Sequence, residues 1–457
     1  MVPASVTAMP DADVAGPSGH RREIARLAVP AFLALIAEPL FLLADSAIIG
    51  HLGTVPLAGL GIASAALVTA AGVFVFLAYG TTSVVARHLG AGDQRSAVAA
   101  GIDGLWLAVG LGAVVAVLTA VFAEPICALF GSSPDALAQA TTYLRVSAAG
   151  LPGMLVVLAV TGVLRGLQDT RTPLVASGVG FGANIVLNLV FVYGFGWGIA
   201  GSAWGTVIAQ TGMATGLVVV LLGAARRLEA RLRPHPGRIL GAARTGIPLL
   251  VRTIALRATM LVTTWVAASL GDVPLAAHQV ALTIWSFLAF ALDALAIAGQ
   301  ALTGKALGAG DRAAVRDTLA IMVRWGVVGG LVVGLVLAAV HQLVPALFTS
   351  DPQVREALGA ALVVVGLGQA LSGYVFVLDG VLIGAGDGRW LAWASVAGFV
   401  AYLPFILWVR HAGSSGSAVR DVVALWLAFT AFMAIRGALL WWRSRQDAWL
   451  VIGTGRA

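Results

Sequence analysis

Two short stretches, LGTVPLA (52–58) and LGDVPLA (270–276), are almost identical and begin 218 residues apart. The same offset places RHLGAGD (87–93) on KALGAGD (305–311), far along the chain. Further pairs at this offset are Pro30 with Pro248, ALF (128–130) with ALF (346–348), Pro134 with Pro352, and TGVLRGLQDTR (161–171) with DGVLIGAGDGR (379–389). Because chance rarely produces separated matches at one constant offset, the chain contains an internal repeat.

Apolar residues make up 59% of the 457 residues, charged residues only 11%, and the mean hydropathy is +0.95. A soluble domain has about 45–50% apolar and about 25% charged residues. These values exclude a water-soluble globule, a disordered chain and a collagen-like fibre. The apolar runs are continuous, which also excludes the alternating strands of an outer-membrane barrel. The composition predicts an all-α polytopic membrane protein, whose single Cys127 allows no internal disulfide.

Apolar runs separated by polar, Gly or Pro residues predict twelve transmembrane helices, since one span needs about 20 residues. They cover residues 25–49, 56–86, 96–121, 137–166, 173–196, 198–224, 245–270, 274–304, 314–342, 354–385, 390–410 and 419–442. The first six form an N-lobe (25–224) and the last six a C-lobe (245–442). We expect a disordered cytoplasmic tail (1–24), a cytoplasmic linker (225–244) and a cytoplasmic C-terminal tail (443–457) around them.

The repeat offset spans six helices, which is an even number, so both copies enter the membrane in the same orientation. This predicts a parallel repeat, with two six-helix bundles related by a pseudo-two-fold axis along the membrane normal. Such an arrangement is typical of secondary transporters that alternate access at the interface between the two halves.

The net charge of +7 and the pI near 10.4 reflect membrane topology rather than nucleic-acid binding. Twenty of the 28 Lys and Arg residues fall on the side of the N-terminus, three fall opposite, and five lie within helices. Positive charge marks cytoplasmic loops. We therefore expect both termini in the cytoplasm and a multi-pass protein of the plasma (inner) membrane.

Glycine-rich segments such as LGAGD (89–93) and GAGDGR (384–389) resemble phosphate-binding loops, but they lack the Walker spacing with Lys and Ser or Thr. Each falls at an expected helix end, where Gly supplies the left-handed residue that ends a helix. We interpret them as structural turns.

Five acidic residues fall within the expected helices, where a charged side chain costs about 2.5–3.5 kcal/mol. They are Glu38, Asp45, Asp103, Asp293 and Asp379. Asp103 lies about two turns from a helix end and can reach water or a basic loop, which favours a structural role. For Asp293 we expect an internal ion pair with Arg252 or Arg257 on the preceding helix, which lie at a similar depth.

Glu38 and Asp45 are seven residues apart, nearly two turns, so both carboxyl groups lie on one face of the first helix. Pro39 removes a backbone donor between them and predicts a kink or hinge. A carboxyl group held away from water favours its neutral form and can exchange a proton near neutral pH. Both acids are therefore candidates for proton coupling.

The repeat offset tests which polar residues belong to the shared scaffold. It places Asp45 on Thr263 and Asp379 on Thr161, so neither acid is needed by both copies. Asn184 and Asn188 lie four residues apart on one helix face. They either form an interhelical amide hydrogen bond or act beside Asp45.

Several motifs resemble those of the multidrug and toxic compound extrusion (MATE) transporters, most closely the branch named after DNA-damage-inducible protein F. The motifs are LADSAIIGHLG (43–53), AAHQVAL (276–282) and LDALAIAGQALTGKALGAGD (292–311). The resemblance covers nearly the whole chain after its N-terminal tail. It implies a V-shaped pair of six-helix lobes that exports organic, often cationic compounds in exchange for H⁺ or Na⁺.

The resemblance also implies roles for individual residues. The helix-1 acid that couples transport in the family corresponds to Asp45, and the helix-10 acid used in another branch corresponds to Asp379. Some relatives carry Asn then Asp on helix 5, whereas this chain carries Asn184 and Asn188. The missing second acid weakens a two-carboxylate or Na⁺ scheme in the N-lobe.

Our hypothesis is H⁺-coupled antiport of a cationic amphiphile by a monomer in the lipid bilayer, with Asp45 and Glu38 as proton sites and Pro39 as hinge. Asn184, Asn188, Asp379 and Asp293 are cavity candidates. We expect no metal site and no cofactor beyond the coupling ion.

Alternatives within the transporter class are Na⁺-coupled antiport and a lipid-linked oligosaccharide flippase, for which Arg145, Arg252 and Arg257 could supply a cationic cavity. A passive channel is disfavoured by the two-lobe repeat with unequal acids. An intramembrane enzyme is the alternative from a different class, but HExxH and GxSxG motifs are absent and the seven His residues form no ligand-spaced pair.

Overall fold

The computed structural model describes residues 17–131, 133–412 and 416–454. In this part of the chain, twelve helical segments are long and apolar enough to cross a membrane. The N-lobe contains α1 (Pro17–Gly50), α2 (Thr54–Phe74), α3 (Phe76–Gly90), α4 (Gln94–Val121), α5 (Ala123–Ala128), α6 (Pro134–Ser147), α7 (Leu151–Gly166), α8 (Arg171–Leu189) and α9 (Gly198–Arg227). The C-lobe contains α10 (Pro236–Leu270), α11 (Asp272–Gly308), α12 (Arg312–Ala339), α13 (Pro352–Gly384), α14 (Gly388–Ala412) and α15 (Ala418–Ser444). The predicted all-α, twelve-span fold is confirmed.

Two of the boundaries that we predicted from the sequence are corrected by the structure. α1 begins at Pro17, so residues 17–24, which we expected in a disordered tail, are helical, while residues 1–16 lie outside the described residues. α9 ends at Arg227 and α10 begins at Pro236, which reduces the expected linker to 228–235. Hydropathy marks where a helix leaves hydrocarbon, whereas Arg and Leu allow the helix itself to continue.

The spans of the N-lobe are less regular than their repeat mates in the C-lobe. The expected helix 56–86 is divided into α2 and α3 at Val75, whereas its counterpart α11 is continuous. A short 3₁₀ turn, η3 (Ala148–Gly150), separates α6 from α7, and a π-helical turn, η4 (Val190–Gly194), follows α8. Departures of this kind often accompany functional sites in helices.

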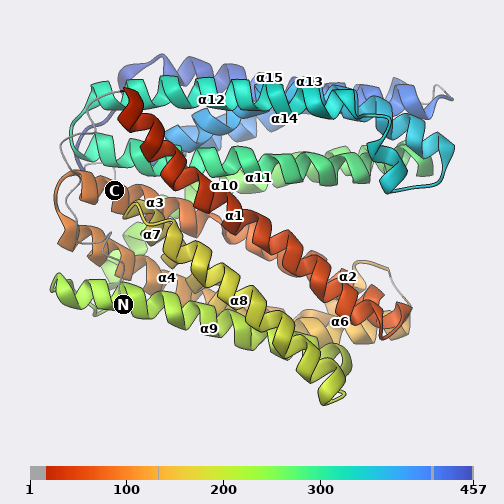
Figure 1. The fold of residues 1–457 in the computed structure, drawn as a ribbon, viewed down its shortest axis with the longest axis horizontal. Coiled ribbons are helices and arrows are strands. Elements are labelled where there is room, and N and C mark those ends of the chain that lie inside the picture. Colours follow the sequence, from red (N-terminus) through yellow and green to blue (C-terminus); the bar gives the residue numbers. More distant parts are fainter. Residues whose placement is uncertain (1–16, 132, 413–415, 455–457) are drawn as a thin grey trace.

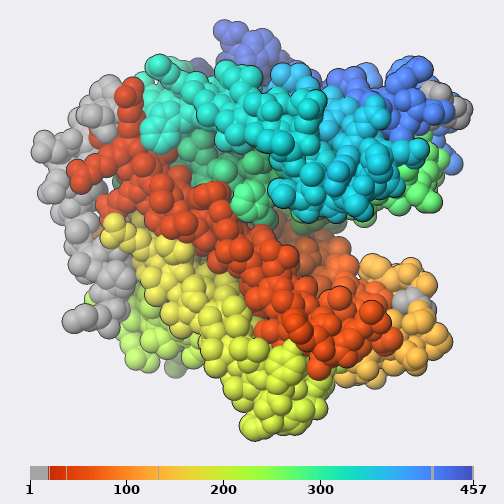
Figure 2. Space-filling model, turned by 45° about the vertical axis from the view of Figure 1, so that its right-hand side comes forward, coloured from red at the N-terminus to blue at the C-terminus, as the bar shows by residue number. Residues whose placement is uncertain are grey.

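The two lobes meet at one end of the molecule and separate towards the other (Figure 1). The end where they meet carries the turns at 91–93 and 309–311 and the α9–α10 connection, and we call it the closed end. At the opposite, open end, Figure 2 shows a hollow between the C-lobe surface and the N-lobe surface. α1 crosses diagonally, packing on α11 and α12 near its start and on α2 and α8 towards its end. The expected V shape is confirmed.

A backbone contact between α3 and α11 joins the lobes at the closed end. A methyl group on Gly90 would collide with the carbonyl oxygen of Lys305, and one on Gly308 would collide with that of Arg87. Gly90 and Gly308 are repeat mates, as are Arg87 and Lys305, so the same contact occurs twice. Only residues without a side chain allow two helices to approach this closely.

The glycine-rich segments that follow these contacts are helix-ending turns, as predicted. Gly92 and Gly310 have positive φ angles of 78° and 77°. Asp93 and Asp311 then cap α4 and α12, each accepting a backbone N–H three residues further on at 2.9 Å. The repeated motif therefore combines a close helix contact, a left-handed turn and a helix cap.

Arg87 extends the interlobe contact to the segment after α15. Its guanidinium group donates to the carbonyl oxygens of Ala385 (2.6 Å), Val451 (2.9 Å) and Gly453 (2.7 Å). The Gly453 N–H donates to the Leu307 carbonyl at 2.8 Å. An N-lobe side chain thus holds both α13 and the C-terminal segment at the closed end.

We expect Gly90→Ala to lower the free energy of unfolding by about 1–3 kcal/mol, because the added methyl group has no room beside the Lys305 carbonyl. Thermal unfolding of the detergent-solubilised protein measures this change. Gly110→Ala in α4 is the control, since nothing lies within 4 Å of a methyl group at Gly110. Equal midpoints for the two variants would contradict the importance of the contact.

Candidate functional site

Asp45 lies near the end of α1, and its side chain is buried among three other N-lobe helices, leaving the residue 2% exposed. One carboxylate oxygen accepts hydrogen bonds from Asn188 Nδ2 (2.8 Å) and Ser202 Oγ (2.5 Å). The other oxygen accepts from the Tyr143 hydroxyl at 3.1 Å. These donors come from α8, α9 and α6. The predicted coupling acid is therefore a deeply buried group held by side chains of its own lobe.

All hydrogen-bond partners of Asp45 are electrically neutral. Among the described residues, no Lys, Arg or His nitrogen lies within 4.0 Å of its carboxylate. A buried charge without a counter-ion is costly, and hydrogen bonds from neutral donors offset only part of that cost. The site is consistent with a carboxyl group that exchanges a proton, because hydroxyl and amide donors can reorient when the charge disappears.

The structure separates the two asparagines of α8. Asn188 contacts Asp45, whereas Asn184 donates to Thr206 Oγ1 at 3.0 Å, one helical turn away. Asn184 thus forms the interhelical hydrogen bond of the first alternative, while Asn188 lies beside Asp45 and its role there stays a prediction. The side-chain oxygens of Asn184 and Asn188 are buried and have no hydrogen-bond partner in the described part of the chain. Both amides retain acceptor capacity near the carboxyl group.

The first-helix candidates around Asp45 are only partly described. The backbone of Glu38 lies in α1, but its side chain lies outside the described residues, so its role stays a prediction. α1 is continuous through Pro30 and Pro39. Pro39 cannot donate to the carbonyl group of Leu35 one turn earlier, which leaves the helix weaker at this point. Its role as a hinge also stays a prediction.

The corresponding position in the C-lobe is neutral. Thr263, the repeat mate of Asp45, shares a hydrogen bond of 2.7 Å with the hydroxyl of Tyr402. Both side chains are buried. Neither group ionises near neutral pH. The scaffold therefore tolerates an uncharged pair where the N-lobe carries a carboxyl group, as the repeat offset predicted.

Asp379 of the C-lobe is neutralised by two arginines. It pairs with Arg252 of α10 and with Arg436 of α15, whose Nη2 lies 3.4 Å from the carboxylate. Arg252 also lies over the ring of Tyr79, a residue of the N-lobe, at 5.7 Å from its centroid. This pairing corrects the prediction for Arg252, because its partner is Asp379 and not Asp293. The sequence could not decide between Asp293 and Asp379 as the partner of Arg252, because both acids lie at a depth that Arg252 reaches.

Asp293 instead lies in electrostatic range of Arg252 and of Arg165 on α7 of the N-lobe, with no ion pair among the described residues. Arg257 is exposed, and its guanidinium group fills the space beside Gly72 of α2. The predicted pairing of Asp293 with Arg257 is therefore wrong as well. Asp103 approaches Arg238 at 3.8 Å, which confirms the expected contact with a basic segment.

Sequence reasoning missed two of the three donors to Asp45. Tyr143 and Ser202 belong to no motif that we singled out, and they lie 98 and 157 residues from Asp45. The only signal they carry is a polar group on a helix that crosses the membrane, which several other Ser, Thr and Tyr residues share. The contact of Arg436 with Asp379 was also not predicted.

The MatE family model matches the chain twice, over residues 30–190 and 248–408. The two matches start 218 residues apart, at the repeat offset found in the sequence, and together cover well over half of the chain. The chain belongs to the MATE transporter family. It is therefore a member of the multidrug and toxic compound efflux transporters, as the resemblance implied.

Two relatives illustrate the range of this family. This MATE transporter is 31% identical over 440 residues to DNA damage-inducible protein F of Escherichia coli (strain K12), covering 93% of this chain and 92% of that protein. It is 29% identical over 476 residues to Protein DETOXIFICATION 45, chloroplastic, of Arabidopsis thaliana, covering 96% and 81% of the two chains. The expected relation to the DinF-like branch is confirmed.

Solved structures share the fold. An Asp-to-Asn mutant of the Vibrio cholerae MATE transporter VcmN superposes with a TM-score of 0.82 at 23% identity, covering 94% of this chain and 98% of that one. A MATE in complex with MaL6 gives the same TM-score at 22% identity, covering 94% and 97%.

We expect Asp379→Asn to lower the free energy of unfolding by about 3–5 kcal/mol, because it leaves the buried Arg252 and Arg436 without a counter-ion. Thermal unfolding in detergent measures the change. Asp317→Asn, which removes an exposed carboxylate from α12, is the control and should leave the midpoint unchanged. A similar midpoint for both variants would show that the ion pairs contribute no net stability.

Proposed function

We propose that this MATE transporter exports small cationic amphiphiles in exchange for protons, and that Asp45 binds the coupling proton. The observation that carries the proposal is the Asp45 carboxyl group, buried and surrounded by neutral donors. Asp379 of the C-lobe is buried to a similar degree, and its charge is held by Arg252 and Arg436. Of these two acids, Asp45 is the one whose protonation leaves no buried arginine unpaired.

The partners of Asp45 can serve both of its protonation states. Tyr143 and Ser202 carry hydroxyl groups that donate to a carboxylate or accept from a carboxylic acid after rotation. Asn188 presents an N–H group to the carboxylate, and rotation of its amide would present the unpartnered oxygen to the acid proton. The proton can therefore bind before any helix moves.

We infer that the closed end faces the cytoplasm, because most Lys and Arg residues lie on that side. The hollow between the lobes then opens to the outside of the plasma membrane, with both termini in the cytoplasm. Asp45 lies five residues before the end of α1, about 8 Å from the open end. This position favours proton entry from outside.

Coupling follows from the loss of charge at Asp45. Protonation removes the attraction of the carboxylate for a cationic cargo and weakens its hold on α6, α8 and α9. α1 then bends at Pro39 and the cargo leaves, after which the lobes rock about the closed-end contact and the proton departs to the cytoplasm. A membrane potential of 100 mV supplies about 2.3 kcal/mol per proton. Solved structures of a MATE of the same fold in a straight and in a bent conformation support such a movement.

We expect Asp45→Asn to abolish efflux of a cationic dye from proteoliposomes driven by an imposed pH gradient, since the amide cannot exchange a proton. Asp103→Asn is the matched control, because it removes a buried N-lobe carboxylate that lies near Arg238, and transport should persist. Separate H⁺ and Na⁺ gradients identify the coupling ion. Efflux driven by the Na⁺ gradient alone, or normal efflux by Asp45→Asn, would refute the proposed coupling.

We expect Pro39→Ala to slow efflux severalfold while raising or preserving thermal stability, because alanine restores the hydrogen bond to the preceding turn and stiffens α1. Initial efflux rates and the unfolding midpoint are measured on the same preparation. Pro30→Ala is the control, since Pro30 has a repeat mate in Pro248 and belongs to the shared scaffold. Unchanged efflux by Pro39→Ala would exclude bending at this residue as a slow step.

A further inference from the structure

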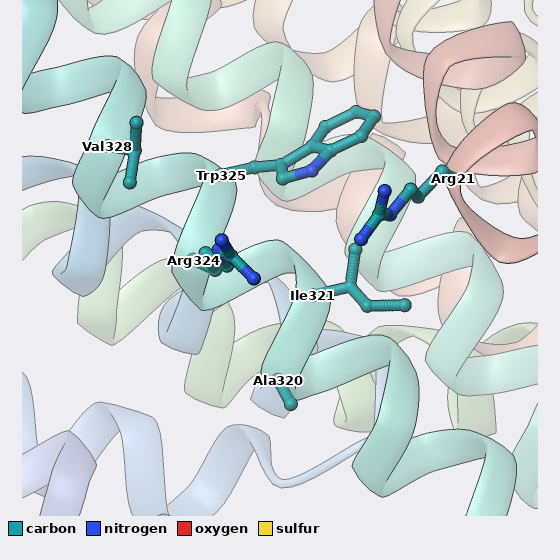
Figure 3. A pocket seen from close by; sticks show the side chains of 6 residues that line it. All are labelled: Arg21, Ala320, Ile321, Arg324, Trp325 and Val328. Atoms are coloured by element: carbon teal, nitrogen blue, oxygen red, sulfur yellow. The ribbon is translucent and has the colours of Figure 1, made fainter. Parts of the chain in front are cut away.

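A pocket of about 600 Å³ lies between the start of α1 and α12, apart from the Asp45 site. Its lining consists of Arg21 from α1 and of Ala320, Ile321, Arg324, Trp325 and Val328 from α12. Figure 3 shows the guanidinium group of Arg21 beside the Ile321 side chain, with Arg324 on the neighbouring stretch of α12. The pocket thus combines two positive charges from different helices with an apolar and aromatic wall.

The two arginines of this pocket have no acidic partner in the described part of the chain. Arg21 and Arg324 are exposed, and neither forms an ion pair there. Glu23, which lies near Arg21 in sequence, is paired with Lys305 at 2.8 Å. Asp317 lies seven residues before Arg324, which is about 10 Å along α12 and beyond ion-pair distance. Among the described residues, the positive charge of the pocket is therefore uncompensated.

The depth of Arg324 makes this charge unusual. Arg324 lies twelve residues after the first residue of α12, about 18 Å along the helix from the closed end. An unpaired arginine facing hydrocarbon at that depth costs free energy unless an anion reaches it. Side chains on a helix lean towards its N-terminus, so the guanidinium group reaches back towards the headgroup region. Arg21, in the first turns of α1, approaches the same space from the membrane surface.

We propose that this pocket binds the phosphate group of an anionic phospholipid in the leaflet at the closed end. Guanidinium groups bind phosphate oxygens in pairs, and basic pockets between membrane helices suit such headgroups. Ile321 and Val328 offer an apolar surface to the acyl chains, and the Trp325 indole suits the interface. The bound lipid links the start of α1, the helix that carries Asp45, to the C-lobe. The proposal does not depend on the direction or ion of transport.

The test is a titration of the purified full-length protein in detergent with phosphatidylglycerol or phosphatidylcholine of identical acyl chains, with bound lipid counted by native mass spectrometry. We expect preferential binding of phosphatidylglycerol. The double variant Arg21→Gln/Arg324→Gln should weaken it by about tenfold to thirtyfold. The matched control Arg22→Gln/Arg312→Gln removes the same charge from exposed positions of the same two helices and should bind as the unmodified protein does.

Two further binding measurements distinguish a lipid in the pocket from a free anion or from the N-terminal segment. Millimolar inorganic phosphate should not displace phosphatidylglycerol, and its full displacement would indicate a site for free anions. A chain lacking residues 1–16 should bind the lipid as the full chain does, and binding seen only after this truncation would show that the N-terminal segment occupies the pocket. Equal binding of the two lipids, or equal loss in both double variants, would overturn the proposal.

A charge-preserving variant distinguishes a loss of lipid binding from a loss of folding. Arg21→Lys/Arg324→Lys keeps both positive charges but loses the paired hydrogen bonds of guanidinium, so its affinity should fall between those of the unmodified protein and the glutamine variant. The unfolding midpoint of every variant in phosphatidylcholine confirms that it is folded. A lysine variant as weak as the glutamine variant would contradict a contribution from charge.

Discussion

The contact of α3 with α11 at the closed end is the constraint on which the arrangement of the two lobes depends. Gly90 and Gly308 lie against the carbonyl groups of Lys305 and Arg87, so the two backbones touch without intervening side chains. The contact lies at one end of the molecule, and the lobes diverge from it towards the open end (Figure 1). Gly92 and Gly310 form the turns that follow directly, and Asp93 and Asp311 cap α4 and α12, which ties the contact to the local sequence of both repeats.

Within this nearly symmetric scaffold, the charged groups are distributed asymmetrically. The N-lobe buries Asp45 among neutral donors, whereas the C-lobe places the neutral pair Thr263 and Tyr402 at the equivalent position. The C-lobe buries Asp379 instead, where the N-lobe has Thr161, and compensates it with two arginines. An ion pair resists protonation because its partner would be left unpaired, whereas protonation of Asp45 leaves no ion-pair partner behind among the described residues. The C-lobe therefore holds its acid in ion pairs, whereas the N-lobe holds its acid among neutral donors, where we propose that it exchanges a proton.

α1 connects the features that distinguish this chain. Its first turns border the arginine-lined pocket on α12, its middle crosses the region between the lobes, and its last turns carry Asp45. A change in the N-lobe site can therefore reach the C-lobe through a single helix that Pro39 weakens. The α2–α3 span is divided at Val75 and α8 continues into the π-helical turn η4, so spans that neighbour α1 in the N-lobe also have irregular backbone.

The sequence by itself determined the twelve spans and the parallel repeat, and it singled out Asp45 as a candidate. Hydropathy and a constant offset are properties of the chain read in order, and an acid in an apolar helix stands out without any partner. Only the tertiary structure decided that Tyr143 and Ser202 hold Asp45, that Arg252 binds Asp379 rather than Asp293, and where α1 and α10 begin. These contacts depend on how the helices of each lobe rotate and approach one another. Side chains more than ninety residues apart in sequence become neighbours only when the helices of a lobe pack together.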